Sequence, residues 1–198
     1  MLIPADEEIR ALHAKYAPTQ AAFELVYTHC EIVCGIAEQL LAEGDPGLNV
    51  ELVRAGSLLH DIGVYHLYDA DGQIDGAGYI RHGILGYELL EEEGLPDAVR
   101  RFCSCHTGVG ITRDDVRSQG LPLPVADYLA ESREEELVMY ADKFHSKTDP
   151  PTFVTAASYA ARVRRFGADK VARFTAMCDG FGVPDLAPFI AAYGHAAA

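Results

Sequence analysis

The stretch LLHDIGVYHL, residues 58–67, constrains the fold of this chain most strongly, because it places a histidine and an aspartate directly behind an apolar run. A surface pair would need no explanation. Burying His60 and Asp61 at the end of a helix is costly unless the pair has partners or binds a metal ion. Other segments of the chain are therefore expected to supply such partners.

Apolar residues recur at helical spacing along most of the sequence. Asn49 is suited to cap the helix that follows it, and Ser132 with Glu135 has the spacing of a capping box. The glycine- and aspartate-rich segment 68–78 is expected to form a loop that has room for one small hairpin. Few segments resemble strands, so the fold class is all-α. Helices are predicted at 21–44, 50–63, 79–94, 96–106, 132–146, 152–166, 168–180 and 185–195.

Length and charge restrict the class of protein. A chain of 198 residues is expected to form one domain. Its formal net charge of −14 disfavours binding to nucleic acids and anionic membranes. No apolar run approaches the ~20 residues that span a bilayer, and the first residues do not resemble a secretory signal. These features predict a cytoplasmic protein without membrane or nucleic-acid partners, and they leave a homodimer open.

The cysteines allow two interpretations. Their odd count of five does not resemble a disulfide framework. Four of them could in principle hold a structural zinc ion, but buried free thiols are the favoured interpretation. The four are Cys30, Cys34, Cys103 and Cys105.

Histidines and aspartates gather near the ends of the predicted helices. Imidazole and carboxylate together suit iron, manganese, cobalt, nickel or zinc. Neighbouring residues on a helix diverge by about 100°, so His60 could bind one metal while the Asp61 carboxylate bridges to a second. His13, His66 and His195 are better explained as core or surface residues. The residues in question are His29, His60, Asp61, His82, His106, Asp142 and His145.

The motif HDIG at 60–63 is followed by RHG, CHTG and YADKFHSKT, and this series resembles the HD-domain metal-dependent phosphohydrolase superfamily over roughly residues 20–150. The order His…His-Asp…His…His…Asp is the version associated with dinuclear sites, and the segments are similar to small stand-alone prokaryotic members. The resemblance implies a compact helical bundle around the metal-binding core. Helices between 152 and 195 are expected to pack on that core.

The resemblance also implies a ligand set and a reaction. His29, His60, Asp61 and Asp142 would bind the first metal, whereas His82 and His106 would bind the second, with Asp61 bridging. One or two divalent ions are expected, with iron or manganese favoured and cobalt, nickel, zinc or magnesium open. A metal-bound hydroxide would attack the phosphorus of a small phosphorylated substrate, expected to be a nucleotide.

Cations beside the ligands are the candidates for binding the substrate's phosphate. Arg81 next to His82 and Lys143 next to Asp142 are predicted, together with Asp61, to be catalytic groups. Lys147 and Arg113 are weaker substrate-binding candidates. A long irregular loop over 107–131 is expected to act as a lid or specificity wall.

Departures from the family pattern keep other functions open. Val64 stands where cyclic-dinucleotide phosphodiesterases of the superfamily carry a lysine, and no GYP sequence follows. This argues against cyclic-dinucleotide cleavage. Some members with the same ligands are di-iron oxygenases, so that alternative stays open. A non-catalytic sensor of a nucleotide or metal is a further alternative.

Overall fold

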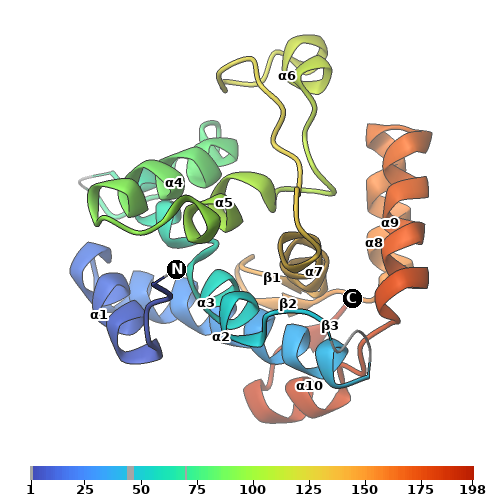
Figure 1. The fold of residues 1–198 in the computed structure, drawn as a ribbon, viewed down its shortest axis with the longest axis horizontal. Helices are drawn as coiled ribbons and strands as arrows, with labels where there is room; N and C mark the ends of the chain where they lie inside the picture. The colour runs from blue at the N-terminus through green and yellow to red at the C-terminus, as the bar shows by residue number, and fades with distance from the viewer. Residues whose placement is uncertain (1, 44–46, 70) are drawn as a thin grey trace.

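The computed structural model describes residues 2–43, 47–69 and 71–198, and helices dominate it (Figure 1). The α-helices are α1 Asp6–Tyr16, α2 Gln20–Glu43, α3 Val50–Leu59, α4 His82–Glu92, α5 Asp97–Cys105, α6 Arg113–Gln119, α7 Arg133–Ala141, α8 Ala156–Val163, α9 Ala168–Phe181 and α10 Ala187–Tyr193. The 3₁₀ segments are η1 Ile62–Leu67, η2 Tyr79–Arg81, η3 Asp142–Phe144 and η4 Arg164–Phe166. The predicted all-α class is confirmed.

A small three-stranded sheet is the exception to the helical pattern. Its strands are β1 His145–Ser146, β2 Thr152–Phe153 and β3 Ala196–Ala197. The first two run antiparallel, and the last two run parallel. The sheet therefore joins the segment that follows α7 to residues near the C-terminus, although it is too short to change the fold class.

The predicted helix starts are confirmed where a capping side chain was identified. The Asn49 side chain accepts a hydrogen bond from the Leu52 backbone at 3.0 Å. Ser132 Oγ accepts one from the Glu135 backbone at 3.1 Å, and the Glu135 carboxylate accepts one from the Ser132 backbone at 3.4 Å. The 68–78 loop contains a single antiparallel bridge between Tyr68 and Ile74, so the hairpin is minimal.

Several predicted boundaries need correction, because three helices stop or start where the chain turns. The predicted helix 50–63 ends at Leu59 and continues as η1, and 79–94 begins with η2 before α4. The helix predicted to reach 146 ends at Ala141 and passes through η3 into β1. The predicted helix end at Gly44 lies outside the described residues.

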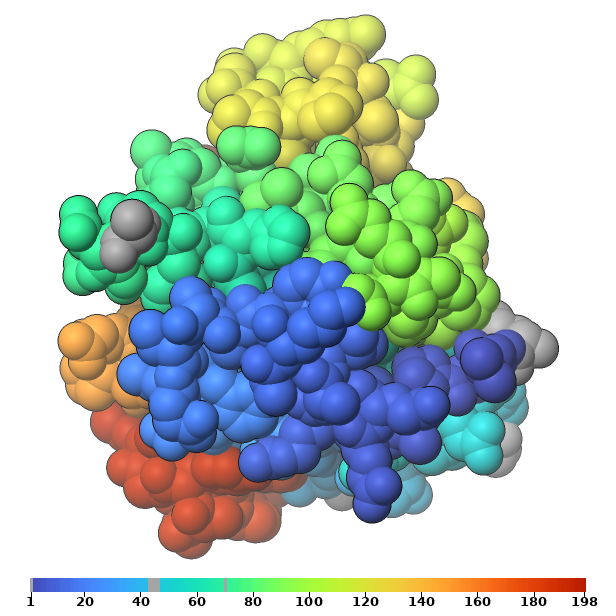
Figure 2. All heavy atoms as spheres, turned by 90° about the vertical axis from the view of Figure 1, so that its left-hand side faces the viewer, coloured from blue at the N-terminus to red at the C-terminus, as the bar shows by residue number. Residues whose placement is uncertain are grey.

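Two helices escaped prediction. The first is α1, and the second is α6, which lies inside the predicted loop 107–131. The start of α6 is a capping box between Thr112 and Asp115, and it ends at Gly120 in the left-handed conformation. The sequence thus carried a signal for this helix. The α6 segment and its flanking chain project from the body of the molecule (Figures 1 and 2).

Apolar side chains form two buried clusters. One joins α2, α7 and α9, with Ile36, Tyr140 and Phe174 among its members. The other joins α1 to α5, with Ile9 and Leu59 inside it. A fully buried side chain of this size contributes roughly 1.5–3 kcal/mol, so α9 is held firmly against α7. The C-terminal helices therefore pack on the same core as the helices that precede them.

In the described part of the chain, no helix is both long and apolar enough to span a membrane.

Candidate metal centre

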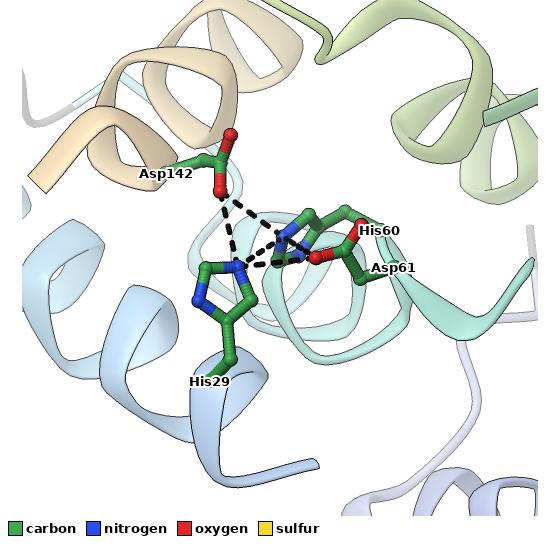
Figure 3. Close-up of side chains that lie close together, drawn as sticks. All are labelled: His29, His60, Asp61 and Asp142. Atoms are coloured by element: carbon green, nitrogen blue, oxygen red, sulfur yellow. Dashed lines mark hydrogen bonds and ion pairs between the residues drawn. The ribbon is translucent and has the colours of Figure 1, made fainter. Parts of the chain in front are cut away.

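Six of the predicted site residues meet at one buried point between the helices. Four of them are drawn in Figure 3, where the side chains of His29, His60, Asp61 and Asp142 converge. All but Asp142 are almost completely buried. Their positions are His29 in α2, His60 and Asp61 after α3, His82 at the start of α4, His106 at the end of α5 and Asp142 at the start of η3.

The first group of potential ligand atoms belongs to His29, His60, Asp61 and Asp142. His29 Nε2 lies 3.1 Å from Asp61 Oδ2, 3.1 Å from Asp142 Oδ1 and 3.2 Å from His60 Nε2. With metal–ligand bonds of about 2.0–2.2 Å, two ligands of one ion stand about 3.0–3.5 Å apart. The four atoms therefore have the spacing that a single bound ion requires.

The second group uses the other oxygen of the same carboxylate. Asp61 Oδ1 lies 3.4 Å from His82 Nε2 and 3.5 Å from His106 Nε2. This oxygen is buried and has no hydrogen-bond partner among the described residues. Asp61 thus presents one oxygen to each group, which is the arrangement of a carboxylate that bridges two ions.

Backbone carbonyls fix the tautomers of three histidines. The Nδ1 atoms of His60, His82 and His106 lie 2.7, 2.6 and 2.9 Å from the carbonyl oxygens of residues 57, 79 and 102. A carbonyl can only accept, so each Nδ1 carries a proton, and in the neutral imidazole Nε2 keeps its lone pair. Metal-binding histidines commonly donate their other N–H in this way.

The pair His82 and His106 shows most clearly that a cation is needed. Their Nε2 atoms face one another at 3.0 Å. Burial lowers the pKa of both rings, that of His82 to about 4, so both are neutral near pH 7. Two lone pairs then oppose each other with no proton between them, and a metal ion would satisfy both. The donor set therefore fits a divalent transition metal.

Charges around the first group also favour a cation at its centre. Burial alone would raise the pKa of Asp61, but Lys147 and His60 hold it well below its usual range. Asp142 behaves similarly because of Lys143. Burial would lower the pKa of His60, yet Asp61 raises it well above the ordinary value. The two carboxylates thus stabilise positive charge between them.

Gly63, the last residue of HDIG, lets η1 and α4 approach closely. A Cβ at this position would lie 2.1 Å from the His82 carbonyl oxygen and 2.3 Å from the Gly86 nitrogen. Real Cβ atoms essentially never come so close to backbone atoms. The glycine therefore allows His82 to reach Asp61, and a larger residue would push the second group apart.

The predicted cations fall into two classes. Lys143 is buried, and its Nζ lies 2.6 Å from Asp142 Oδ2 and 3.0 Å from the His106 carbonyl oxygen. Lys147 forms an ion pair with Asp61. Both lysines thus lie beside the ligand cluster, and Lys147 is placed more centrally than the sequence analysis expected.

The two arginines require correction. Arg81 is exposed and lines a surface depression with Glu88 and residues 121–124 instead of facing the cluster. Adjacent residues in a helical turn point in different directions, which is why a neighbour of His82 can face solvent. Arg113 is also exposed and forms an ion pair with Asp127 at 2.7 Å. Neither arginine forms an ion pair with a residue of the cluster in the described part of the chain.

His145 was noted in the sequence but not assigned a role. Its Nδ1 lies 2.9 Å from His29 Nδ1, and its Nε2 lies 3.0 Å from His195 Nδ1. If His29 Nε2 binds metal, its Nδ1 must carry the proton and donate to His145. His145 then donates from Nε2 to His195, so one consistent direction of hydrogen bonding runs through the three rings.

A cavity of about 510 Å³ opens beside the cluster and is called the charged cavity here. Its volume lies in the roughly 300–1,000 Å³ range of ligand pockets. The cavity is lined by Asp142 of the cluster and both lysines, together with residues of α8 and η4, a segment that was predicted only as a helix packed on the core. Its wall includes Tyr79, Lys143, Lys147, Tyr159, Arg162 and Arg165.

The cysteines do not form an alternative metal site in the described part of the chain. Both groups that could hold an ion consist of histidine and aspartate alone. All five cysteines are free thiols. Burial raises the pKa of Cys103 strongly, and its Sγ donates to the Leu59 carbonyl at 3.3 Å. The buried-thiol interpretation therefore agrees with the structure.

Residues 26–147 of the chain match the sequence model of the HD domain family. All six residues of the cluster lie within this range. The chain is also similar in structure to the HD domain of the L. monocytogenes phosphodiesterase PgpH, with a TM-score of 0.52 and 16% identity. The match covers 87% of this chain and 95% of that domain, which has also been solved in complex with cyclic-di-AMP.

Two relatives are more similar in sequence. An uncharacterised protein, MJ0778 of Methanocaldococcus jannaschii, is 38% identical over 122 residues, which cover 60% of this chain and 65% of that protein. A tRNA (cytidine(56)-2′-O)-methyltransferase of Picrophilus torridus is 36% identical over 128 residues, or 65% of this chain. The chain spans only 33% of the length of that enzyme.

Proposed function

The chain belongs to the HD domain family, and from this premise we propose that it is a metal-dependent phosphohydrolase acting on a small phosphorylated molecule, specifically a nucleotide. The observation that carries the proposal is the bridging position of Asp61 between two groups of ligand atoms, beside a cavity with cationic walls. Divalent metals bound there would supply Lewis acidity and make water a nucleophile near neutral pH.

The side chains of this chain would perform three tasks. Three of the six proposed ligands direct Nε2 toward the cluster because their Nδ1 protons are engaged by carbonyls, so each Nε2 would offer its lone pair to an ion when the ring is neutral. Lys143 and Lys147 stand where the cluster meets the charged cavity, so they would bind phosphoryl oxygens whose charge grows during the reaction. Burial of the cluster limits the access of bulk water.

Arg162 and Arg165 would bind the anionic part of the substrate in the charged cavity. Both line the charged cavity, and neither forms an ion pair with any described residue. Most other basic side chains of the chain are paired, as Arg54 is with Asp6. In a chain with a net charge of −14, unpaired arginines at the mouth of a cavity favour an anionic ligand.

The test is phosphate release by protein loaded with manganese, cobalt or ferrous iron under argon. Turnover of nucleotides without oxygen would support hydrolysis. Oxygen uptake that depends on iron and substrate would instead indicate the oxygenase chemistry that other members use. Nucleotide binding without turnover under all conditions would indicate a sensor.

Matched arginine variants sharpen this test. Replacing Arg162 and Arg165 by glutamine should raise KM about five- to tenfold through lost charged hydrogen bonds, with little change in kcat. Arg164→Gln is the control, because Arg164 lies in the same short segment but lines neither the charged cavity nor any neighbouring one described here. If KM rises equally in the Arg162 and Arg165 variants and in Arg164→Gln, Arg162 and Arg165 do not bind the substrate as proposed.

A further inference from the structure

A second, smaller cavity adjoins the charged cavity and is called the apolar cavity here. Its volume is about 160 Å³. The two cavities share wall residues Gly108, Tyr159, Val163 and Phe166, so they are neighbours across one strip of α8 and η4. Because the volume is below the range of roughly 300–1,000 Å³ typical of whole ligands, the apolar cavity suits one part of a ligand.

The lining of the apolar cavity is mainly aliphatic and aromatic. Ile80 from η2 and Ile111 and Leu121 from the two ends of the α6 segment form one side. Tyr159 and Phe166 contribute aromatic rings on the other side. Such a lining favours a flat apolar group over a second phosphate.

The charged residues of the apolar cavity are already occupied by one another. Lys170 Nζ lies 2.5 Å from Asp115 Oδ2 and 3.0 Å from the Gly110 carbonyl oxygen. The Asp115 carboxylate also accepts hydrogen bonds from Thr112. Among the described residues that line the apolar cavity, both charged side chains are therefore paired, whereas Arg162 and Arg165 in the charged cavity form no ion pair with a described residue.

Phe166 adds an independent observation. This residue is 48% exposed although its side chain is large and apolar. It borders both cavities, and the Arg165 guanidinium lies 4.7 Å from its centroid. Packing of the core does not explain this position, whereas stacking on a planar ligand would.

We propose that the apolar cavity is a base subsite, which binds the nucleobase of the substrate while the phosphate lies in the charged cavity. The inference rests on the proposed function, because only a phosphorylated substrate at the cluster would span both cavities. It assigns a place to the base of the proposed nucleotide substrate and predicts that sugar phosphates without a base bind more weakly. Phe166 and Tyr159 would be specificity-determining residues.

The experiment compares four ribonucleoside 5′-monophosphates with ribose 5-phosphate, which has the same phosphate and sugar but no base. Binding is measured by calorimetry, and phosphate release is measured in parallel. Wild type should bind the best nucleotide at least about tenfold more tightly than ribose 5-phosphate, or about 1.4 kcal/mol. Phe166→Ala should remove most of this difference, because it should weaken nucleotide binding far more than ribose 5-phosphate binding.

The control is Val183→Ala, which removes another exposed apolar side chain that lines neither cavity. It should behave as wild type. Equal affinity for ribose 5-phosphate and every nucleotide would overturn the base subsite, and so would a Phe166→Ala effect that is the same for both ligand types. Nucleotide binding that depends on Phe166 but is never followed by phosphate release would keep the subsite and overturn the hydrolase.

Discussion

Two environments in this molecule bury histidines, and they differ in what faces the second ring nitrogen. Between α1, α3 and η1, His13 Nε2 lies 2.8 Å from the Leu58 carbonyl oxygen, and Nδ1 lies 2.8 Å from the Tyr65 hydroxyl. Both nitrogens therefore have protein partners. In the metal centre, the Nδ1 atoms of His82 and His106 are engaged, but their Nε2 atoms face each other.

This difference separates a structural histidine from a ligand more clearly than burial does, because all three rings are almost fully buried. His13 satisfies its hydrogen-bonding groups on folding and needs nothing else. The centre leaves lone pairs and a carboxylate oxygen without partners, so its side chains are arranged for an ion. The following predictions test whether the two environments behave as differently as their geometry indicates.

The largest effect is expected from Asp61→Asn, which keeps the size of the side chain but removes the charge that both groups share. Elemental analysis should find about two metal equivalents in wild type and close to none in the variant, with phosphate release at background. His13→Gln should keep the metal. Two equivalents retained in Asp61→Asn would refute the bridging role.

The next effect is expected from His82→Ala and His106→Ala, each of which removes a proposed ligand of the second group alone. Each variant should keep about one equivalent of metal, because the four atoms around His29 remain. Activity should fall by at least about 100-fold, more than the loss typical of outer-shell partners. Loss of both equivalents would show that the two groups bind cooperatively.

The sequence predicted the residues of the metal centre better than the residues around the cavity. HDIG and its spaced histidines identified the six residues because each carries its chemistry in its type and local position. The sequence favoured Arg81 over Lys147, yet Lys147 pairs with Asp61 whereas Arg81 lines a surface depression, since adjacency in sequence does not tell which way a side chain points. Arg162, Arg165 and Phe166 did not stand out in the sequence, because only the tertiary packing of α8 and η4 brings them to the charged cavity.

A smaller effect is expected at His13 when the pH changes. Burial lowers the pKa of His13 to about 4, below the ordinary 6.5. The unfolded state thus binds more protons between these values, so the stabilisation is present above pH 6.5 and is lost as the pH falls toward 4. His13 should contribute a loss of about 2–3 kcal/mol between pH 7.5 and 4.5.

The measurement is urea unfolding of metal-free protein at the two pH values, comparing wild type with His13→Gln. The variant should lose less stability on acidification, because glutamine has no proton to gain. His66→Gln, at an exposed position, is the control and should follow wild type. Parallel pH dependence in His13→Gln and wild type would show that His13 does not titrate as its burial indicates.

The smallest effect is expected at His145, which has partners on both nitrogens like His13 but touches the metal centre through His29. His145→Ala should weaken manganese or cobalt binding about 10- to 100-fold, because the His29 ring loses the acceptor that fixes its tautomer. His145→Asn should restore much of the affinity, since the amide oxygen can take the place of Nδ1 as an acceptor. If alanine and asparagine bind metal equally well, His145 belongs with His13 as a packing residue; if only asparagine rescues, the metal centre extends one histidine beyond its ligands.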